Sequence, residues 1–409
     1  KHVTFCIRSA FDKSVIIRQF FIHIKQQCKG VLRHRHGRIP FYICHHNSAA
    51  FHIRHVHNIG SGRRHTDQLY IFCLFQQFLI HGNFINNDNI RIFNSLQHTI
   101  TGWPGGKPNA DDTFRPERAK PYPKRVIVFS PHPDDDVISM GGTLKRLADQ
   151  KHDVHVAYET SGNIAVGDED MMRYIMLIDN IAKKFKFDTP ELLKKSNEIH
   201  KFIGKKKDGE SDTPDIRFIK TMIRQGEART ACNYIGIKPQ NVHFLNLPFY
   251  ETGTIKKGDL SEADIQIVKD LIESVKPHQI FVAGDLADPH GTHRVCTDAV
   301  FAAIDLEKEE GAKWLKECRI WMYRGAWAEW EIDHIEMAVP LSPEELRQKR
   351  NSILKHQSHM ESAPFLGDDE RLFWQRAEDR NKATADLYAS LGLASYEAIE
   401  AFVEYHPIR

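Results

Sequence analysis

The chain has 409 residues, a net charge of +2 and an apolar content of 41%. This length allows two or three globular domains, each with a sizeable core. The most apolar stretch, residues 69–80, holds about 12 residues where a membrane-spanning helix needs about 20, so we expect no membrane span. Residues 1–11 also lack the apolar core and the cleavage site of a secretory signal.

The first 100 residues differ in composition from the rest of the chain. They contain 13 Lys and Arg, 3 Asp and no Glu, together with half of the 24 His residues. A His-rich tract can bind metal, but this one lacks carboxylate partners and a repeated ligand spacing. We therefore expect residues 1–100 to be a poorly structured, basic, unassigned segment. A nucleic-acid-binding arm and a segment that is not a natural coding product are the alternatives.

Pro and Gly are frequent in residues 101–123, which we interpret as a linker. From residue 124 onward the pattern predicts alternating strands and helices. The predicted strands are 125–130, 153–159, 241–247, 279–283 and 318–323. The predicted helices are 142–150, 168–186, 190–203, 213–235, 261–275 and two that begin near residues 292 and 342. This alternation predicts a Rossmann-like α/β domain over 124–409, with a mostly parallel sheet and helices on both faces.

Three cysteines lie in the acidic part of the chain at wide spacing, namely Cys232, Cys296 and Cys318. An odd number without a Cys-x-x-Cys pair indicates free thiols and argues against a disulfide framework. Free thiols are typical of a reducing compartment, so we expect a cytoplasmic location. We expect Cys296 to be a buried apolar side chain and not a metal ligand.

The most informative motif begins where the strand 125–130 ends. It reads Pro-His-Pro-Asp-Asp-Asp over residues 131–136 and places His132 beside three consecutive carboxylates. Residues that follow a buried parallel strand lie at its carboxyl end, where open α/β sheets bind ligands. Asp134 and Asp135 can simply cap the following helix. Three adjacent carboxylates repel one another, however, and a divalent metal would compensate their charge.

A second polar motif follows the strand 279–283 and occupies residues 285–294. It contains His290 and His293, whose spacing of three residues brings them to one side of a helical turn. The two motifs together offer His132, Asp135 and His293 as nitrogen and oxygen ligands. Three protein ligands with one open position are the arrangement of catalytic zinc.

Two further residues of these motifs have the chemistry of proton transfer. Asp134 is adjacent to the expected ligand Asp135 but points in a different direction, so it is free to act as a base. His290, in the second motif, is able to act as an acid.

The paired motifs resemble the LmbE/PIG-L family of metal-dependent N-acetylglucosaminyl deacetylases over residues 124–359. The resemblance implies a metal held by His132, Asp135 and His293. It also implies Asp134 as the general base and His290 as the group that steadies the tetrahedral intermediate and helps the amine to leave.

Two positions depart from the family pattern, and one more residue follows it. Asp136 stands where the family usually has Glu, and Gly291-Thr292 stands where it commonly has Pro-Asp. Arg224 belongs to a segment that resembles a family Arg-x-x-Glu, which implies contact with the substrate. The linker and domain also resemble the carboxyl-terminal half of bacterial fusions with a glucosamine-6-phosphate deaminase-like domain.

The resemblance implies a zinc-dependent amidohydrolase that removes the N-acetyl group from an N-acetylglucosamine-containing small molecule. Another divalent metal such as iron is the alternative cofactor. The alternative function is a non-catalytic, metal-containing sugar-binding or regulatory module of a deaminase fusion. A nucleic-acid partner would produce binding that weakens steeply with salt and disappears without residues 1–100, and we do not expect it.

Overall fold

The computed structural model describes two short strands near the amino terminus and most of the chain after residue 88. The described residues are 44–47, 50–53, 89–109, 120–254, 256–284, 291–325, 328–359 and 371–406. The chain forms two compact units, Lys1–Arg91 and Ile92–Arg409. In the first unit, β1 (Cys44–Asn47) and β2 (Ala50–Ile53) form an antiparallel pair. The expectation of a poorly structured segment is wrong for its end: residues 92–99 are helical, and Leu96 packs in a core of the second unit with Ile335 and Tyr388. The other expectations for the basic segment lie outside the described residues.

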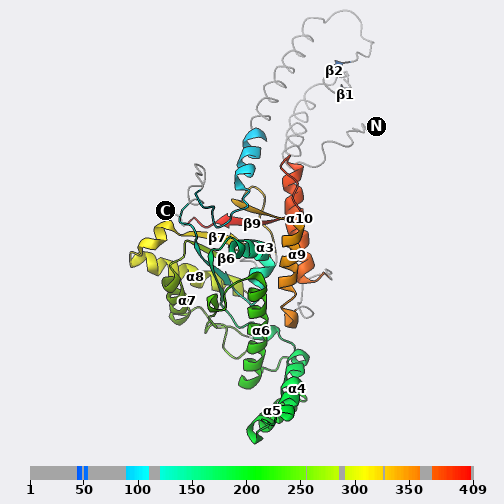
Figure 1. Ribbon diagram of the computed structural model, residues 1–409, viewed down its shortest axis with the longest axis vertical. Helices are drawn as coiled ribbons and strands as arrows, with labels where there is room; N and C mark the ends of the chain where they lie inside the picture. Colours follow the sequence, from blue (N-terminus) through cyan, green and yellow to red (C-terminus); the bar gives the residue numbers. More distant parts are fainter. Residues whose placement is uncertain are drawn as a thin grey trace, which may run out of the picture. The chain divides into compact units, whose positions relative to one another are not determined.

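The second unit is built around a seven-stranded sheet in the order β5-β4-β3-β6-β7-β9-β8 (Figure 1). Its strands are β3 (Arg125–Ser130), β4 (Asp153–Tyr158), β5 (Val242–Phe244), β6 (Gln279–Ala283), β7 (Arg319–Tyr323), β8 (Met337–Leu341) and β9 (Ala398–Glu404). The strands from β5 to β7 pair in parallel, whereas β9 runs antiparallel to both β7 and β8. The prediction of a mostly parallel sheet is therefore confirmed.

Helices cover both faces of this sheet. They are α3 (Asp135–Asp149), α4 (Asp168–Phe185), α5 (Pro190–Ile203), α6 (Pro214–Ile235), α7 (Glu262–Val275), α8 (Thr292–Glu309), α9 (Pro343–Ile353) and α10 (Phe373–Ser390). Successive side chains of a strand point to opposite faces. Val126 and Val128 pack with α3, α6, α9 and α10, whereas Ile127 and Phe129 pack with α7 and α8. The apolar residues of β3 thus contribute to the cores on both faces of the sheet.

The strand order reverses between β3 and β6. From β3 the chain adds β4 and then β5 on one side, while β6 and β7 extend the sheet on the other side. Such a topological switch point leaves a crevice at the carboxyl ends of the two central strands. Both polar motifs of the sequence follow these strands, so the fold brings them to the same edge.

Helix α3 begins earlier in the chain than the predicted helix 142–150. It starts at Asp135 and is interrupted at Met140, which has φ −139° and ψ 28°. At this interruption, Glu400 of β9 accepts hydrogen bonds from the N–H groups of Gly142 at 3.0 Å and Thr143 at 2.6 Å. A carboxylate from a distant strand therefore caps the second part of the helix, as an N-cap side chain does locally.

The sequence analysis did not predict β8, α10 and β9. Pro340 lies inside β8, and a strand tolerates proline because this one is at the edge of the sheet. Glu400 is fully buried inside β9, where it interrupts the apolar pattern. The edge at β8 is also covered by the preceding chain, since the Thr101 N–H donates to Ala338 O at 2.8 Å. The first residues of the Pro/Gly-rich segment thus contact the domain.

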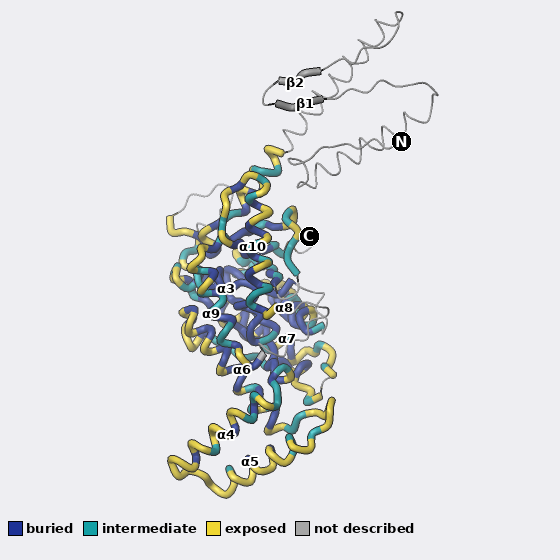
Figure 2. Tube along the Cα trace, turned by 90° about the vertical axis from the view of Figure 1, so that its right-hand side faces the viewer, coloured by how far each residue is buried: buried dark blue, intermediate teal, exposed yellow. Residues whose placement is uncertain are grey.

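Helices α4 and α5 are the most exposed part of the second unit, as Figure 2 shows. Helix α5 begins in the manner expected from its sequence, with Thr189 as the N-cap and Pro190 at the first helical position. The outer sides of both helices consist largely of exposed residues. No helix in the described part of the chain has the length and apolar character needed to cross a membrane.

Candidate metal centre and catalytic site

Three side chains from two separate strand ends converge in one cluster. His132 follows β3, Asp135 is the first residue of α3, and His293 is the second residue of α8. One candidate ligand atom from each lies within 4.8 Å of the other two. Asp135 Oδ2 is 3.2 Å from His132 Nδ1 and 3.3 Å from His293 Nε2. The structure thus brings together the three residues predicted as ligands, and their role as ligands stays a prediction.

Local hydrogen bonds fix the turn that carries the first two members. The His132 N–H donates to Asp135 Oδ2 at 2.9 Å, and Ser130 Oγ donates to His132 O at 2.6 Å. The backbone turn at Gly291 positions His293. Gly291 has a φ of 66° and directs the chain into α8. This conformation suits a glycine, which has no Cβ to clash.

Burial and neighbouring charges set the ionisation of the cluster. Burial opposes ionisation of Asp135, but the adjacent His293 and His132 rings hold the pKa of that carboxyl well below its usual range. Burial is the largest influence on His132 and lowers its pKa against the opposing effect of Asp135. The cluster therefore combines an ionised carboxylate with a neutral imidazole, which are the protonation states that bind metal.

This donor set fits a divalent metal ion. Two imidazole nitrogens and one carboxylate oxygen match the three-ligand sets of catalytic zinc and of two-His, one-carboxylate iron sites. Within the described residues, no second group of three such side chains comes as close together. The cluster is therefore the part of the described structure best suited to hold a metal.

Asp134 lies beside the cluster and contacts helix α6. It occupies the N-cap position of α3, but its side chain makes no capping hydrogen bond. Instead, Arg224 Nη2 donates to Asp134 Oδ2 at 3.2 Å and to Pro133 O at 2.5 Å. Asp134 has a φ of 148°, a conformation that costs a residue with a side chain about 1–3 kcal/mol and is concentrated at functional sites. Simple helix capping therefore does not account for this side chain.

A glycine makes the contact between the motif and α6 possible. Gly162 has a φ of 61°, and a Cβ at this position would lie 2.9 Å from Pro133 Cδ and 3.1 Å from Arg224 Nε. Any larger residue would push Arg224 away from Asp134. The turn after β4 thus helps to hold the guanidinium in place.

Asp136, to which the sequence assigned no chemical role, is completely buried. Tyr158 Oη donates to Asp136 Oδ2 at 3.1 Å, and the Asp136 N–H donates to Ser130 Oγ at 3.1 Å. The Tyr158 hydroxyl also lies 3.2 Å from Cys232 Sγ. Burial raises the pKa of Asp136 to about 7. The residue thus joins β3, β4 and the start of α3 next to the metal cluster.

Glu159 is a buried acid that the sequence analysis missed. It follows β4 and is 1% exposed. Burial raises its pKa to about 8, with His293 opposing and Asp135 adding to the effect. These influences show that its carboxyl lies near the cluster. Its position could have identified it from the sequence, because Glu159 is the last residue of the predicted strand 153–159. That strand lies next to β3 and ends at the same edge of the sheet.

Two remaining expectations about the site have different outcomes. His290, the expected acid, lies outside the described residues, so its role stays a prediction. Cys296 is completely buried in the core against α7 and α8 and is not a member of the cluster. Cys232, Cys296 and Cys318 are free thiols.

Comparison with known proteins gives a family match and a close relative. The family model described as "PIG-L: GlcNAc-PI de-N-acetylase" matches residues 127–304. A protein of Bacteroides thetaiotaomicron, described as glucosamine-6-phosphate deaminase-like, is 73% identical over 323 residues, which are 79% of this chain and 49% of that protein. The chain thus spans about half the length of the curated relative that it matches.

Solved structures show weaker similarity. The N,N′-diacetylchitobiose deacetylase from Pyrococcus horikoshii aligns at 18% identity with a TM-score of 0.45, covering 72% of this chain and 87% of that chain. The 4-carboxy-2-hydroxymuconate hydratase GalB from Pseudomonas putida KT2440 aligns at 16% identity with a TM-score of 0.44, covering 70% of this chain and 98% of that chain.

The family match begins within β3 and ends within α8, so it includes both strand ends of the switch point. It contains every member of the cluster formed by His132, Asp135 and His293. Residues 127–304 of this chain form a domain of the PIG-L (LmbE-like) family.

Proposed function

We propose that this protein is a metal-dependent hydrolase that removes the acetyl group from an N-acetylglucosamine-containing substrate. The observation that carries the proposal is the convergence of His132, Asp135 and His293, with Asp134 beside them. The description of the family model as a GlcNAc-PI de-N-acetylase supports the reaction. The metal in this proposal is zinc, with iron as the alternative that the donor set also accommodates.

In this proposal, His132, Asp135 and His293 hold the metal. A bound divalent ion of this kind lowers the pKa of a water molecule and polarises a carbonyl group. Asp134 is the base that accepts a proton from the attacking water, because it lies next to the cluster without being one of its three members. His290 donates the proton that the departing amine requires.

Arg224 has two roles in this proposal. It holds Asp134 through the hydrogen bond from Nη2, and it contributes to substrate binding. Its Nε and Nη1 atoms are buried and have no hydrogen-bond partner within the described residues. Buried donors are normally paired, so these atoms are available to a substrate oxygen once a small shift of the fully buried side chain exposes them.

The alternative is a non-catalytic module that keeps the metal and binds a sugar. The strained backbone of Asp134 favours catalysis, because a purely structural metal site has no need of a carboxylate held in this conformation. A cytoplasmic location remains part of the proposal, and it rests on the free thiols of the described residues.

The decisive experiment measures acetate release from N-acetylglucosamine glycosides by the zinc-loaded protein and by Asp134→Asn. Loss of a general base typically lowers the rate by about 100-fold to 10,000-fold, and we expect a decrease in kcat of this size. Asp298→Asn is the matched control, because it removes an exposed carboxylate from α8, the helix that also carries His293.

Two results would contradict this proposal. Full activity of Asp134→Asn would exclude the assigned base. Sugar binding by a zinc-loaded protein that releases no acetate from any glycoside tested would favour the non-catalytic module.

A further inference from the structure

The end of helix α4 carries a run of basic and aromatic side chains. Residues 183–187 read Lys-Lys-Phe-Lys-Phe, and every residue of this run is exposed. Phe185 is 69% exposed and Phe187 is 49% exposed. Between them, Lys186 has a φ of 60° and ends the helix, so both aromatic residues lie where the chain turns toward α5. Large apolar side chains gathered on a surface mark a site of interaction.

The exposed apolar surface continues from this run along α4. Tyr174, Leu177, Ile178 and Ile181 are each between 38% and 54% exposed. Their spacing of three or four residues places them on the same side of the helix as Phe185. We call these five side chains, together with the adjacent Phe of the run, the apolar stripe of α4.

A different side of α4 faces the core. Met171 and Ile175 are buried and pack with Ile199 of α5 and Ile216 of α6. The apolar stripe is therefore additional to the side that holds the helix on the domain. The described part of the chain leaves the stripe uncovered, and Figure 2 shows the exposed outer surface of both helices.

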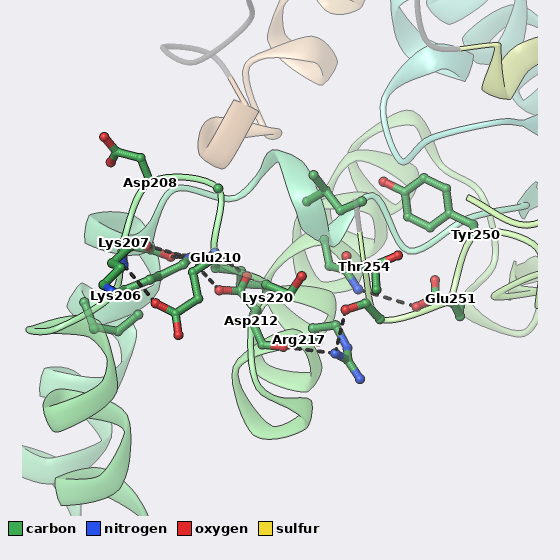
Figure 3. Close-up of a pocket in the computed structure, with 17 residues that line it drawn as sticks. Lys206, Lys207, Asp208, Glu210, Asp212, Arg217, Lys220, Tyr250, Glu251 and Thr254 are labelled. Atoms are coloured by element: carbon green, nitrogen blue, oxygen red, sulfur yellow. Dashed lines mark hydrogen bonds and ion pairs between the residues drawn. The ribbon is translucent and has the colours of Figure 1, made fainter. Parts of the chain in front are cut away.

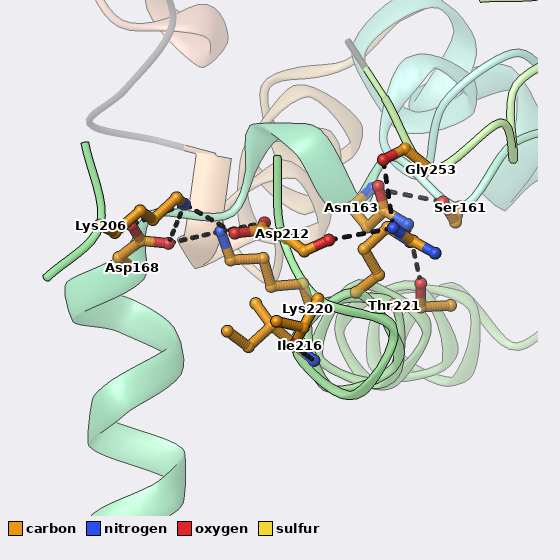
Figure 4. A network of polar contacts seen from close by, with 11 residues as sticks. Ser161, Asn163, Asp168, Lys206, Asp212, Ile216, Lys220, Thr221 and Gly253 are labelled. Atoms are coloured by element: carbon orange, nitrogen blue, oxygen red, sulfur yellow. Dashed lines mark hydrogen bonds and ion pairs between the residues drawn. The ribbon is translucent and has the colours of Figure 1, made fainter. Parts of the chain in front are cut away.

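An ion-pair network fixes the other end of α4 (Figure 4). Asp168, the first residue of α4, lies 2.9 Å from Lys206 Nζ through Oδ2 and 2.7 Å from Lys220 Nζ through Oδ1. Asp212 pairs with the same two lysines at 2.6 Å and 2.8 Å. Figure 3 shows both lysines in the wall of a cavity of about 350 Å³. Each ammonium group is neutralised by two carboxylates, so neither lysine is available to an external anion.

The lysines beside the apolar stripe are in a different state. Lys183, Lys184 and Lys186 are exposed and form no ion pair within the described residues. This surface thus combines large apolar side chains with free positive charge. The combination is typical of helices that lie at the surface of a membrane.

Other occupants match this surface less well. A second copy of the chain, paired through the same stripe, would bring two sets of these lysines together, and like charges repel. Single-stranded nucleic acid would match the lysines and the Phe rings, but bases stack on aromatic side chains, whereas Leu177, Ile178 and Ile181 are aliphatic. An anionic lipid surface matches both features, because its phosphates attract lysines and its acyl chains accept aliphatic and aromatic side chains.

We propose that the end of α4 docks onto an anionic membrane surface. Phe185 and Phe187 enter the boundary between the head groups and the acyl chains, and the rest of the apolar stripe lies along this boundary. The three lysines of the run contact lipid phosphates. The attachment is peripheral, and it does not depend on the reaction proposed for the metal cluster.

The experiment measures binding of the full chain to vesicles by sedimentation. Vesicles of phosphatidylcholine mixed with phosphatidylglycerol are compared with vesicles of phosphatidylcholine alone. We expect Phe185→Ser, Phe187→Ser to bind the anionic vesicles at least about 10-fold more weakly than the wild type, because two large apolar side chains no longer leave water. Leu372→Ser, Leu387→Ser removes two exposed apolar side chains elsewhere and should keep the affinity of the wild type.

A second pair of variants tests the lysines at matched net charge, because residues 1–100 are also basic and attract anionic vesicles. Lys183→Gln, Lys184→Gln, Lys186→Gln should bind the anionic vesicles at least about 10-fold more weakly. Lys308→Gln, Lys313→Gln, Lys316→Gln removes the same charge from exposed positions in and after α8, and its affinity should stay close to that of the wild type. Circular dichroism establishes that all variants are folded.

Three results would overturn the proposal. They are no binding of the wild type to anionic vesicles, wild-type affinity of the Phe185→Ser, Phe187→Ser variant, and an equal loss of affinity in the two triple lysine variants. Light scattering and binding of a single-stranded oligonucleotide test the other occupants. A dimer or an oligonucleotide complex that is disrupted by Phe185→Ser, Phe187→Ser, while vesicle binding persists, would assign the stripe to that partner instead.

Discussion

Asp135 is the residue on which the proposed metal centre depends most. A single carboxylate oxygen lies within about 3.3 Å of both imidazoles, and the same oxygen accepts the His132 N–H. It is therefore both an ionised acceptor and the organiser of the turn. Removing the charge from this residue changes the electrostatics of His132 and His293 together.

Zinc binding tests this arrangement without reference to activity. We expect the wild type to bind one zinc ion per chain, and Asp135→Asn to bind it at least about 100-fold more weakly, since even outer partners of a metal site contribute 10–100-fold. Calorimetric titration with zinc gives both values. His243→Ala removes a partly buried imidazole outside the cluster and should leave the affinity unchanged; equal affinity in Asp135→Asn would refute the assignment.

Sequence reasoning anticipated which residues meet at the cluster, because strand ends in a parallel sheet share one edge. It could not anticipate the partners of Asp134 and Asp136. The contact of Asp134 with Arg224 depends on α6 passing close to Gly162. The hydrogen bond between Asp136 and Tyr158 depends on the register of β3 and β4. Neither of these contacts produces a periodic pattern of residues in the sequence.

At the level of elements, the interruption of α3 depends on a buried ion pair. Glu400 is fully buried and caps the helix, while Lys349 Nζ lies 2.7 Å from Glu400 Oε1 and 2.7 Å from Asn381 Oδ1. Burial lowers the pKa of Lys349 against the opposing effect of Glu400. The pair joins α3, α9, α10 and β9 around a single carboxylate.

We expect Glu400→Gln to lower the free energy of unfolding by about 3 kcal/mol, because breaking a buried ion pair leaves an uncompensated charge. The double variant Glu400→Gln, Lys349→Met removes the unpaired ammonium and should recover part of this loss. Urea denaturation of the two single variants and the double variant measures the coupling. Strictly additive losses would show that the two side chains do not stabilise the fold as a pair.

Most helices and strands up to β7 were predicted with small errors at their ends, because they combine strong periodicity with clear caps, as at Thr189 and Pro190. The start of α3 and the antiparallel strands β8 and β9 were not. The start of α3 depends on Glu400, which comes from β9 and whose partners lie far away in the sequence, and Pro340 interrupts the pattern of β8. From the sequence alone, a polar residue such as Glu400 is taken as the end of a strand, because its distant partner is not known.

At the scale of the whole molecule, the free energy of unfolding depends on pH through His152. Its Nδ1 accepts the Lys124 N–H at 3.0 Å, and its ring packs edge-on against Tyr122. Burial, with a smaller contribution from Lys124, lowers the pKa of His152 to about 4. The unfolded chain therefore binds a proton between pH 6.5 and 4 that the folded protein does not, and stability falls as pH decreases through this window.

His152→Asn keeps an acceptor for Lys124 and removes the titrating group. We expect the variant to lose about 2 kcal/mol less stability than the wild type between pH 7 and pH 4.5. Chemical denaturation at the two pH values measures this difference. His334→Asn, at an exposed position, should follow the wild type. An identical pH dependence of His152→Asn and wild type would exclude this role of His152.

The cap that Glu400 provides for α3 limits where this chain can be shortened. The family match ends at residue 304, yet the carboxylate that holds the helix behind Asp135 comes from the last strand of the sheet. A shortened chain that stops before β9 would retain every proposed ligand and still lack the support for the helix that presents one of them. The smallest portion worth expressing therefore extends through Glu404, well past the segment by which the family is recognised.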